Sequence, residues 1–259
     1  MKASPAADVR GDGSDRATCT IAAMNGRLGV LAFGDSITNG GGELQWGVAL
    51  QSWALWTARC LALPYSGYAV DGAGVHDVVT EQLPGFETRT GADGRYDVGC
   101  LYIGVNDVRS VDWNPDAFAV DHADALGFLT RRCDRVLALT APLRLGRPPA
   151  DAKVPSLNAI ITRNARAAGA LVVDLGGFGA RNHVMVDYVH PTAFGQIAIA
   201  ERALAVLAAD GLPAKVSPAS LISYRTTRRH RLRGDLTYVY RDVKQRARAA
   251  ALQRAARRS

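Results

Sequence analysis

The sequence lacks several features that would assign it to common protein classes. No apolar run approaches the roughly 20 residues that a membrane-spanning helix needs. A hydrophobic content of 48% with 21% charged residues excludes a fully disordered chain, a collagen and a coiled coil. The first residues contain no apolar core of the kind that a secretory signal has. We therefore expect a globular protein whose residues 1–26 form a disordered leader, with Met24 as an alternative start.

Cysteine is also scarce. The four cysteines lie at positions 19, 60, 100 and 133, too far apart for a C-x-x-C motif. Three of them fall within runs that we interpret below as helix or strand, where buried free thiols are the usual occupants. Disulfides and a metal site are the less favoured alternatives. Free thiols indicate a reducing compartment, so we expect a cytoplasmic protein.

The net charge of +7 is distributed unevenly. Residues 215–259 hold 13 Lys and Arg against 2 Asp and Glu, whereas residues 1–214 hold 18 against 22. The body is thus mildly acidic and the C-terminal segment strongly basic. We expect one enzyme-sized domain over 27–212, followed by a basic linker and an amphipathic tail over 213–259.

Short apolar runs recur along the body. They are separated by roughly 30–40 residues, the length of a strand–helix–strand unit. Helical periodicity fills most of the gaps, and the alternation predicts a five-stranded parallel sheet with helices on both faces. The expected strands are 29–33, 65–70, 98–103, 135–140 and 170–175, and the expected helices are 45–63, 114–133, 153–168 and 192–209. Tryptophans at helical spacing in the first helix are assigned to the core.

The first strand runs directly into the segment G-D-S-I-T. A serine on a tight strand-to-helix turn exposes its hydroxyl and directs nearby N–H groups outward, as an oxyanion requires. An ordinary Gly-Asp-Ser turn is the alternative. A phosphate-binding loop is excluded because no Lys is present there, and Gly-x-Gly-x-x-Gly is also missing. Ser36 is therefore the candidate nucleophile.

Two later motifs carry further candidates. Asn106 follows the third strand in G-V-N-D, where its amide can donate to an oxyanion or merely shape a turn. Asp187 stands three residues before His190, and from there its carboxylate can reach the imidazole Nδ1. A surface loop or a metal-binding pair is the alternative for the second motif.

Taken together, these motifs resemble the blocks of the SGNH/GDSL hydrolase superfamily. G-D-S-I-T resembles its first block with Ser36 as nucleophile, and A-V-D-G-A-G-V-H-D-V resembles its second with Gly72 as an oxyanion-hole N–H. G-V-N-D resembles the third with Asn106 as side-chain donor, and D-Y-V-H-P-T the fifth with Asp187 and His190. The second block departs from the family pattern, because the Asn that often precedes its glycine is missing.

The resemblance covers about residues 27–211 and implies a flavodoxin-like three-layer α/β/α fold. It implies an esterase that forms an acyl-enzyme on its serine, with the oxyanion held by the serine N–H, the glycine N–H and the asparagine amide. It implies no metal and no organic cofactor. The substrate is expected to be a small-molecule, lipid or carbohydrate ester. Alternatives are acyl transfer to an acceptor other than water, and a non-catalytic module that acts through the basic tail.

Several other polar residues have less specific interpretations. Asp35 and Asp107 adjoin the candidate site and are expected to fix turns through backbone hydrogen bonds. His183 is expected to be structural or to lie at the rim of the cleft, and His76 to line the cleft or to begin a helix. The loop 143–153 either selects the acyl or alcohol group or is a plain exposed loop.

The tail from Asp235 onward is predicted to be a basic amphipathic helix. Such a helix fits an anionic membrane surface, which would make the protein peripheral at a membrane. A helix docked on the domain, or a disordered tail, is the simpler alternative, and nucleic acid is the least favoured partner. The sequence does not predict an oligomeric state. The shared apolar face is expected to hold Leu236, Val239, Tyr240, Val243 and Ala247.

Overall fold

The computed structural model describes residues 26–44, 48–90, 94–146, 148–180, 182–222 and 227–256. Its five strands form one parallel sheet in the order β2-β1-β3-β4-β5. This order, with a helix between consecutive strands, confirms the predicted flavodoxin-like arrangement. The strands are β1 (Val30–Gly34), β2 (Tyr65–Gly67), β3 (Tyr96–Tyr102), β4 (Cys133–Leu139) and β5 (Leu171–Val173).

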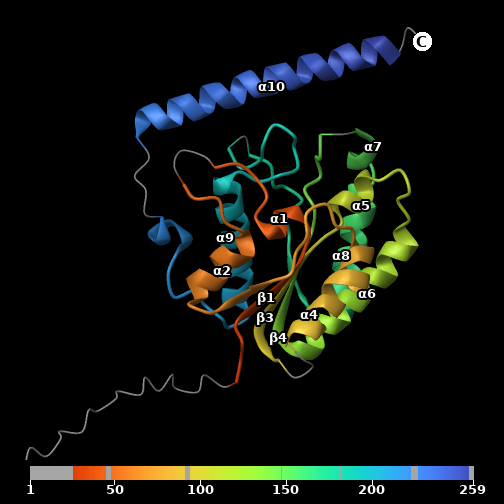
Figure 1. Cartoon of the computed structure of the whole chain (residues 1–259), viewed down its shortest axis with the longest axis vertical. Coiled ribbons are helices and arrows are strands. Elements are labelled where there is room, and N and C mark those ends of the chain that lie inside the picture. The colour runs from red at the N-terminus through yellow and green to blue at the C-terminus, as the bar shows by residue number, and fades with distance from the viewer. Residues whose placement is uncertain are drawn as a thin grey trace, which may run out of the picture.

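Helices cover both faces of the sheet (Figure 1). One layer consists of α2 (Trp53–Leu61) and α9 (Ala193–Ala209), and the other of α4 (Leu83–Thr90), α6 (Pro115–Arg132) and α8 (Val154–Ala168). The remaining elements are α1 (Ser36–Asn39), α3 (Val75–Asp77), the π-helix η1 (Val78–Gln82), α5 (Val105–Arg109), α7 (Pro148–Asp151), the 3₁₀-helix η2 (Pro218–Leu221) and α10 (Arg228–Ala256).

Several element boundaries differ from the predicted ones. The helix expected from residue 45 begins at Trp53, because the Ser52 side chain caps it by accepting from the Ala54 N–H, and residues 48–52 are not helical. The tail helix begins at Arg228 rather than at residue 235. The helical segment 75–90 between β2 and β3 was not predicted.

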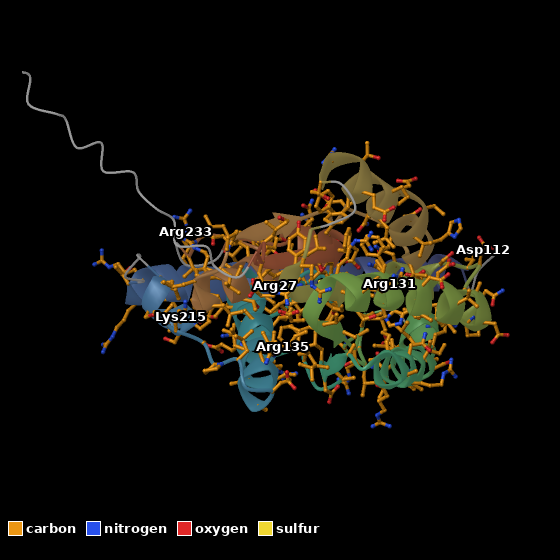
Figure 2. All side chains as sticks on the ribbon, turned by 90° about the horizontal axis from the view of Figure 1, so that it is seen from below. Arg27, Asp112, Arg131, Arg135, Lys215 and Arg233 are labelled. Atoms are coloured by element: carbon orange, nitrogen blue, oxygen red, sulfur yellow. The ribbon has the colours of Figure 1, made fainter. Side chains whose placement is uncertain are left out.

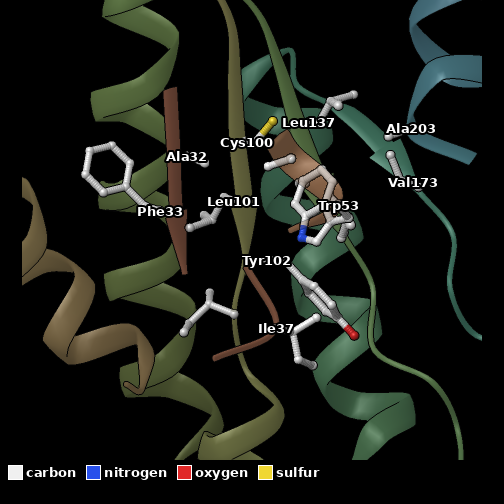
Figure 3. Packing of buried hydrophobic residues seen from close by; sticks show 14 of the residues in the cluster. Ala32, Phe33, Ile37, Trp53, Cys100, Leu101, Tyr102, Leu137, Val173 and Ala203 are labelled. Carbon is white, nitrogen blue, oxygen red and sulfur yellow. The ribbon is translucent and has the colours of Figure 1, made fainter. Parts of the chain in front are cut away.

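The core lies on both faces of the sheet (Figure 3). Phe33 packs on the α4–α6 side, where its ring lies 5.9 Å from Phe86 and 6.0 Å from Phe128 in edge-on geometry. Trp53 and Trp56 are buried on the opposite side, so these two tryptophans belong to the core as predicted, whereas Trp46 lies outside the described residues. The predicted buried free thiols are confirmed for Cys60, Cys100 and Cys133, and Cys19 lies outside the described residues.

Ion pairs gather at the edge where the strands begin, which faces the viewer in Figure 2. Arg27 lies 2.7 Å from Asp134, and Arg135 lies 2.8 Å from Asp210. Within the described ranges, no helix is both long and apolar enough to cross a membrane. The leader predicted for residues 1–26 lies, apart from Gly26, outside those ranges.

Candidate active site

Ser36 is the first residue of α1 and is separated from the end of β1 by Asp35 alone. The turn between them is fixed by Asp35, whose buried Oδ1 accepts from the Ile37 N–H at 2.9 Å. Gly34 has φ of +150°, and a Cβ there would collide with the carbonyl oxygen of Tyr102. The sharp turn therefore requires the Gly-Asp-Ser sequence and places the serine at the end of the strand.

Two buried glutamines hold this turn from opposite sides. Gln82, at the end of η1, accepts from the N–H of Gly34 at 3.1 Å and donates to its carbonyl at 2.8 Å. Gln196 of α9 donates to the carbonyls of Ile37 at 2.9 Å and Gly41 at 3.1 Å, and its oxygen accepts from the first N–H of α2 at 2.8 Å. Sequence reasoning missed both residues. The available signal was a glutamine within an otherwise apolar stretch of α9.

The structure brings Ser36, His190 and Asp187 into one hydrogen-bonded chain. Ser36 Oγ lies 2.9 Å from His190 Nε2, and His190 Nδ1 lies 2.7 Å from Asp187 Oδ2. The second carboxylate oxygen, Oδ1, accepts from the backbone N–H groups of Val189 at 2.9 Å and His190 at 3.1 Å. Both oxygens of Asp187 are thus engaged, and the carboxylate is fixed relative to the imidazole.

The loop that carries His190 is tied together by its own backbone. The Met185 N–H donates to the His190 carbonyl at 2.8 Å, and the Thr192 N–H donates to the His183 carbonyl at 2.9 Å. At its end, the first N–H of α9 donates to the Glu43 carbonyl at 2.9 Å. This last bond joins the end of the His190 loop to the segment that follows α1, the helix that begins with Ser36.

The contact between Asp187 and His190 raises the pKa of the histidine and lowers the pKa of the carboxyl group. The hydrogen bond that His190 donates to Asp187 raises the pKa of His190, although partial burial acts in the opposite direction. Partial burial alone would raise the pKa of Asp187, but the hydrogen bonds from His190 and from two backbone N–H groups outweigh it and lower that pKa. The arrangement can therefore stabilise an imidazolium that forms when the histidine accepts a proton.

The other two candidate residues, one in a loop and one in α5, belong to segments that are bonded to one another. Gly72 has φ of +82°, and Asn106 in α5 donates through Nδ2 to the carbonyl of Ala73 at 3.0 Å. The glycine loop is also attached to α1, since Asn39 Nδ2 donates to Asp71 Oδ1 at 2.9 Å. Both residues thus belong to segments bonded, directly or through one another, to the helix that begins with Ser36.

Two further acids adjoin Ser36 and Asn106 in the sequence: Asp35 fixes its own turn as predicted, whereas Asp107 accepts from an N–H 32 positions away at the start of α3. Asp35 is fully buried, and burial raises the pKa of its carboxyl to about 7. Asp107 accepts from the Val75 N–H at 3.1 Å, and burial raises its pKa to about 6. In each case, the backbone hydrogen bond offsets only part of the cost of burial.

The other two histidine candidates are not members of the hydrogen-bonded chain that joins Ser36, His190 and Asp187. The half-buried ring of His183 stacks on Phe178 with centroids 5.7 Å apart, and burial lowers its pKa. His76 belongs to the first turn of α3, and its Nδ1 lies 3.1 Å from Asp121 Oδ2. Among the described residues, no cluster of His, Cys, Asp and Glu is arranged to hold a metal ion.

Tyr188 connects the loop that carries His190 to two distant segments. It has φ of +63°, and its hydroxyl donates to Asp242 Oδ1 of α10 at 3.1 Å. The loop 143–153 approaches its ring, because a Cβ on Gly146 would lie 2.7 Å from Cδ2. Sequence reasoning missed both contacts, which no local motif indicates.

Comparisons with known proteins agree with this architecture. LAE5, an α/β hydrolase enzyme from the metagenome of Lake Arreo in Spain, superposes with a TM-score of 0.55 at 21% identity, covering 70% of this chain and 95% of that one. Axe2, an acetylxylan esterase from Geobacillus stearothermophilus, superposes with a TM-score of 0.54 at 17% identity, covering 70% and 94%. At these identities the likeness shows a shared fold.

Comparison of the sequence with family profiles shows more than the shared fold, because it identifies the family. Comparison with curated proteins finds no match to this chain. The GDSL-like Lipase/Acylhydrolase family profile, however, matches residues 32–197, more than half of the chain and all of the segment from β1 into α9. The predicted resemblance is confirmed: the chain belongs to the GDSL-like lipase/acylhydrolase family and is a hydrolase that acts on ester bonds.

Proposed function

We propose that the protein hydrolyses carboxylic esters through an acyl-enzyme on Ser36. The observation that carries this proposal is the hydrogen-bonded chain from Ser36 Oγ to His190 Nε2 at 2.9 Å and from His190 Nδ1 to Asp187 at 2.7 Å. A nucleophile, a base and a group that orients the base stand at hydrogen-bonding distance, which is the geometry of nucleophilic catalysis by a serine.

The reaction then proceeds in two halves. Ser36 Oγ attacks the ester carbonyl while its proton passes to His190 Nε2, and Asp187 stabilises the resulting imidazolium. The tetrahedral intermediate collapses, the C–O bond to the alcohol breaks, and His190 returns the proton to the leaving oxygen. Water repeats the sequence on the acyl-enzyme, giving the carboxylic acid and the free serine. Every step uses the chain's own residues.

The oxyanion of each tetrahedral intermediate is held by three donors in this proposal: the Ser36 N–H, the Gly72 N–H and the Asn106 amide. The Ser36 N–H begins α1, where helix N–H groups have no partner within the helix. Asn106 carries two amide hydrogens, so it can keep its bond to Ala73 and still donate to the substrate. Loss of one such donor should raise the barrier by about 3–4 kcal/mol.

A fluorophosphonate probe tests the nucleophile directly, because it reacts with activated serines. It should label the native protein and not the Ser36→Ala variant. The matched control is Ser220→Ala in η2, an exposed serine whose hydroxyl donates to the Ser217 carbonyl at 2.7 Å. Equal labelling of the native protein and Ser36→Ala contradicts the proposal.

The acyl group is addressed by p-nitrophenyl esters of increasing chain length. Axe2, whose fold this chain shares, is an acetylxylan esterase. Preference for the acetyl ester would favour a small ester or carbohydrate substrate, whereas a preference for long chains would favour a lipid. Both outcomes require the same Ser36-dependent chemistry.

A further inference from the structure

Helix α10 lies across the edge of the sheet at which the strands end. In Figure 1 it runs above α1, α5 and α7, and in the perpendicular view of Figure 2 it lies behind the body. Gly234, Tyr238 and Asp242 recur every fourth residue and are half-buried, and Asp242 accepts the hydrogen bond from Tyr188. Residues at this spacing share one side of a helix, so this side of α10 faces the body.

Between residues 232 and 243, the opposite side of α10 is apolar and exposed. The exposed apolar residues there follow one another at spacings of four, three, one and three positions. These spacings place them on one stripe that is turned away from Tyr238. Their exposed fractions range from 43% to 66%. An apolar stripe on the outer side of a helix is the reverse of what packing against the domain would produce. The outer stripe consists of Leu232, Leu236, Val239, Tyr240 and Val243.

Basic residues flank the outer stripe. The sequence of α10 contains nine Lys and Arg against two acidic residues, whereas the body is mildly acidic. Among them, Arg228, Arg229, Arg233 and Lys244 are exposed. Long basic side chains beside an apolar stripe can bury their methylene groups while keeping the charge in water. This is the pattern of a helix that lies in the plane of a lipid surface.

The composition of the outer stripe favours lipid over nucleic acid. Single-stranded nucleic acids are bound by aromatic side chains on which bases stack. Four of the five stripe residues are aliphatic, and only Tyr240 is aromatic. Aliphatic side chains partition into the boundary between lipid head groups and acyl chains, and the positive charge selects anionic head groups.

We propose that α10 binds the surface of an anionic lipid bilayer through the outer stripe and its basic flanks. The helix lies flat on the bilayer, and Asp242 and Tyr188 hold the active-site edge of the domain toward the same side. This binding of α10 to a bilayer does not depend on the proposed esterase mechanism. It assigns α10 the role of a docking element and places the candidate site next to ester groups in the membrane.

Sedimentation of the full-length protein with vesicles tests the proposal. The protein should sediment with vesicles of phosphatidylcholine mixed with phosphatidylserine, and much less with phosphatidylcholine alone. Each Lys or Arg at an anionic surface contributes about 1 kcal/mol, equivalent to about fivefold in affinity. Reversing both charges in Arg233→Glu/Lys244→Glu should therefore weaken binding by about 25-fold or more, and added salt should weaken native binding.

Matched variants on the body serve as controls. Arg131→Glu/Arg166→Glu changes the net charge equally at exposed positions on α6 and α8, and should leave binding near the native level. Leu236→Glu should abolish insertion of the outer stripe. Val120→Glu makes the same type of change at an equally exposed site on α6, 61% against 62%, and should have little effect.

Several results would overturn the proposal. They are equal sedimentation with neutral and anionic vesicles, equal loss of binding in the α10 and body variants, and full binding by Leu236→Glu. Tighter binding to single-stranded RNA than to the anionic vesicles at the same ionic strength would replace lipid with nucleic acid as the partner. Hydrolysis of a dilute soluble ester, which should be unchanged in all these variants, shows that each is folded and separates failed docking from failed catalysis.

Discussion

Replacing Asp187 by Asn tests how the carboxylate controls His190. Asp187 Oδ1 accepts from two backbone N–H groups, those of Val189 and His190, while Oδ2 faces His190 Nδ1. In Asp187→Asn the amide oxygen must remain at the Oδ1 position, because both N–H groups point at it. The amide nitrogen then faces Nδ1, and two donors would oppose each other unless the imidazole moves its proton to Nε2.

That shift of tautomer removes the base. With a proton on Nε2, His190 cannot accept the Ser36 proton across the 2.9 Å contact. Serine triads lose about 10⁴-fold in kcat when the histidine has the wrong tautomer. At 1.36 kcal/mol for each factor of ten, this corresponds to roughly 5.4 kcal/mol of barrier. The fold should be nearly unaffected, because the two backbone hydrogen bonds to residue 187 are retained.

Steady-state hydrolysis of p-nitrophenyl acetate measures the loss in kcat, and the fluorophosphonate labelling rate should fall in parallel. Thermal unfolding of the variant provides the control for folding. The variant Asp187→Asn could instead keep more than a tenth of native kcat while Ser36→Ala is inactive. That result would refute the expected shift of the His190 proton to Nε2. A large fall in Tm would instead show that the carboxylate has a structural role.

Three other predictions concern the surroundings of the same site. The hydrogen bond that His190 donates to Asp187 raises the pKa of His190, and the base must be neutral, so kcat/KM should fall on acidification with a midpoint above the ordinary value of 6.5. Burial raises the pKa of Asp35 from 3.8 to about 7, so the folded state binds a proton that the unfolded state releases, and the free energy of unfolding should fall as pH rises from about 4 to 7. Asp35→Asn should abolish this fall, a difference on the order of 4 kcal/mol in urea unfolding at pH 8. Gln196→Leu removes three hydrogen bonds, so calorimetry should show a loss of roughly 3 kcal/mol at about 1 kcal/mol for each bond, and kcat should fall because Ser36 is no longer held.

The sequence predicted those features that depend on short stretches of chain. The turn around Ser36 is set by three neighbouring residues, and Asp187 meets His190 within one loop, so both can be recognised locally. The strands are apolar runs between turns, and the five predicted ones overlap the five observed. The helical segment 75–90 escaped prediction because Pro84 and Gly85 interrupt its pattern and part of it is a π-helix.

Contacts between residues that are far apart in the sequence could not be predicted from local sequence patterns. Gln82 binds a residue 48 positions away, and Gln196 reaches one 159 positions away. Nothing near either residue in the sequence indicates the backbone groups that it satisfies. The bond between Tyr188 and Asp242 spans 54 positions and joins a loop to the tail, and it likewise becomes visible only in three dimensions.

The length of chain between Ser36 and His190 also bears on how the protein is made. The two residues are 154 positions apart, and the α9 glutamine that holds the serine turn comes later still. Chains fold from the N-terminus as they leave the ribosome. Ser36 is therefore synthesised long before His190 and Gln196. In the proposed mechanism, the Ser36 hydroxyl therefore stays unactivated until the segment that carries His190 and Gln196 has been made and has packed against α1 and α2.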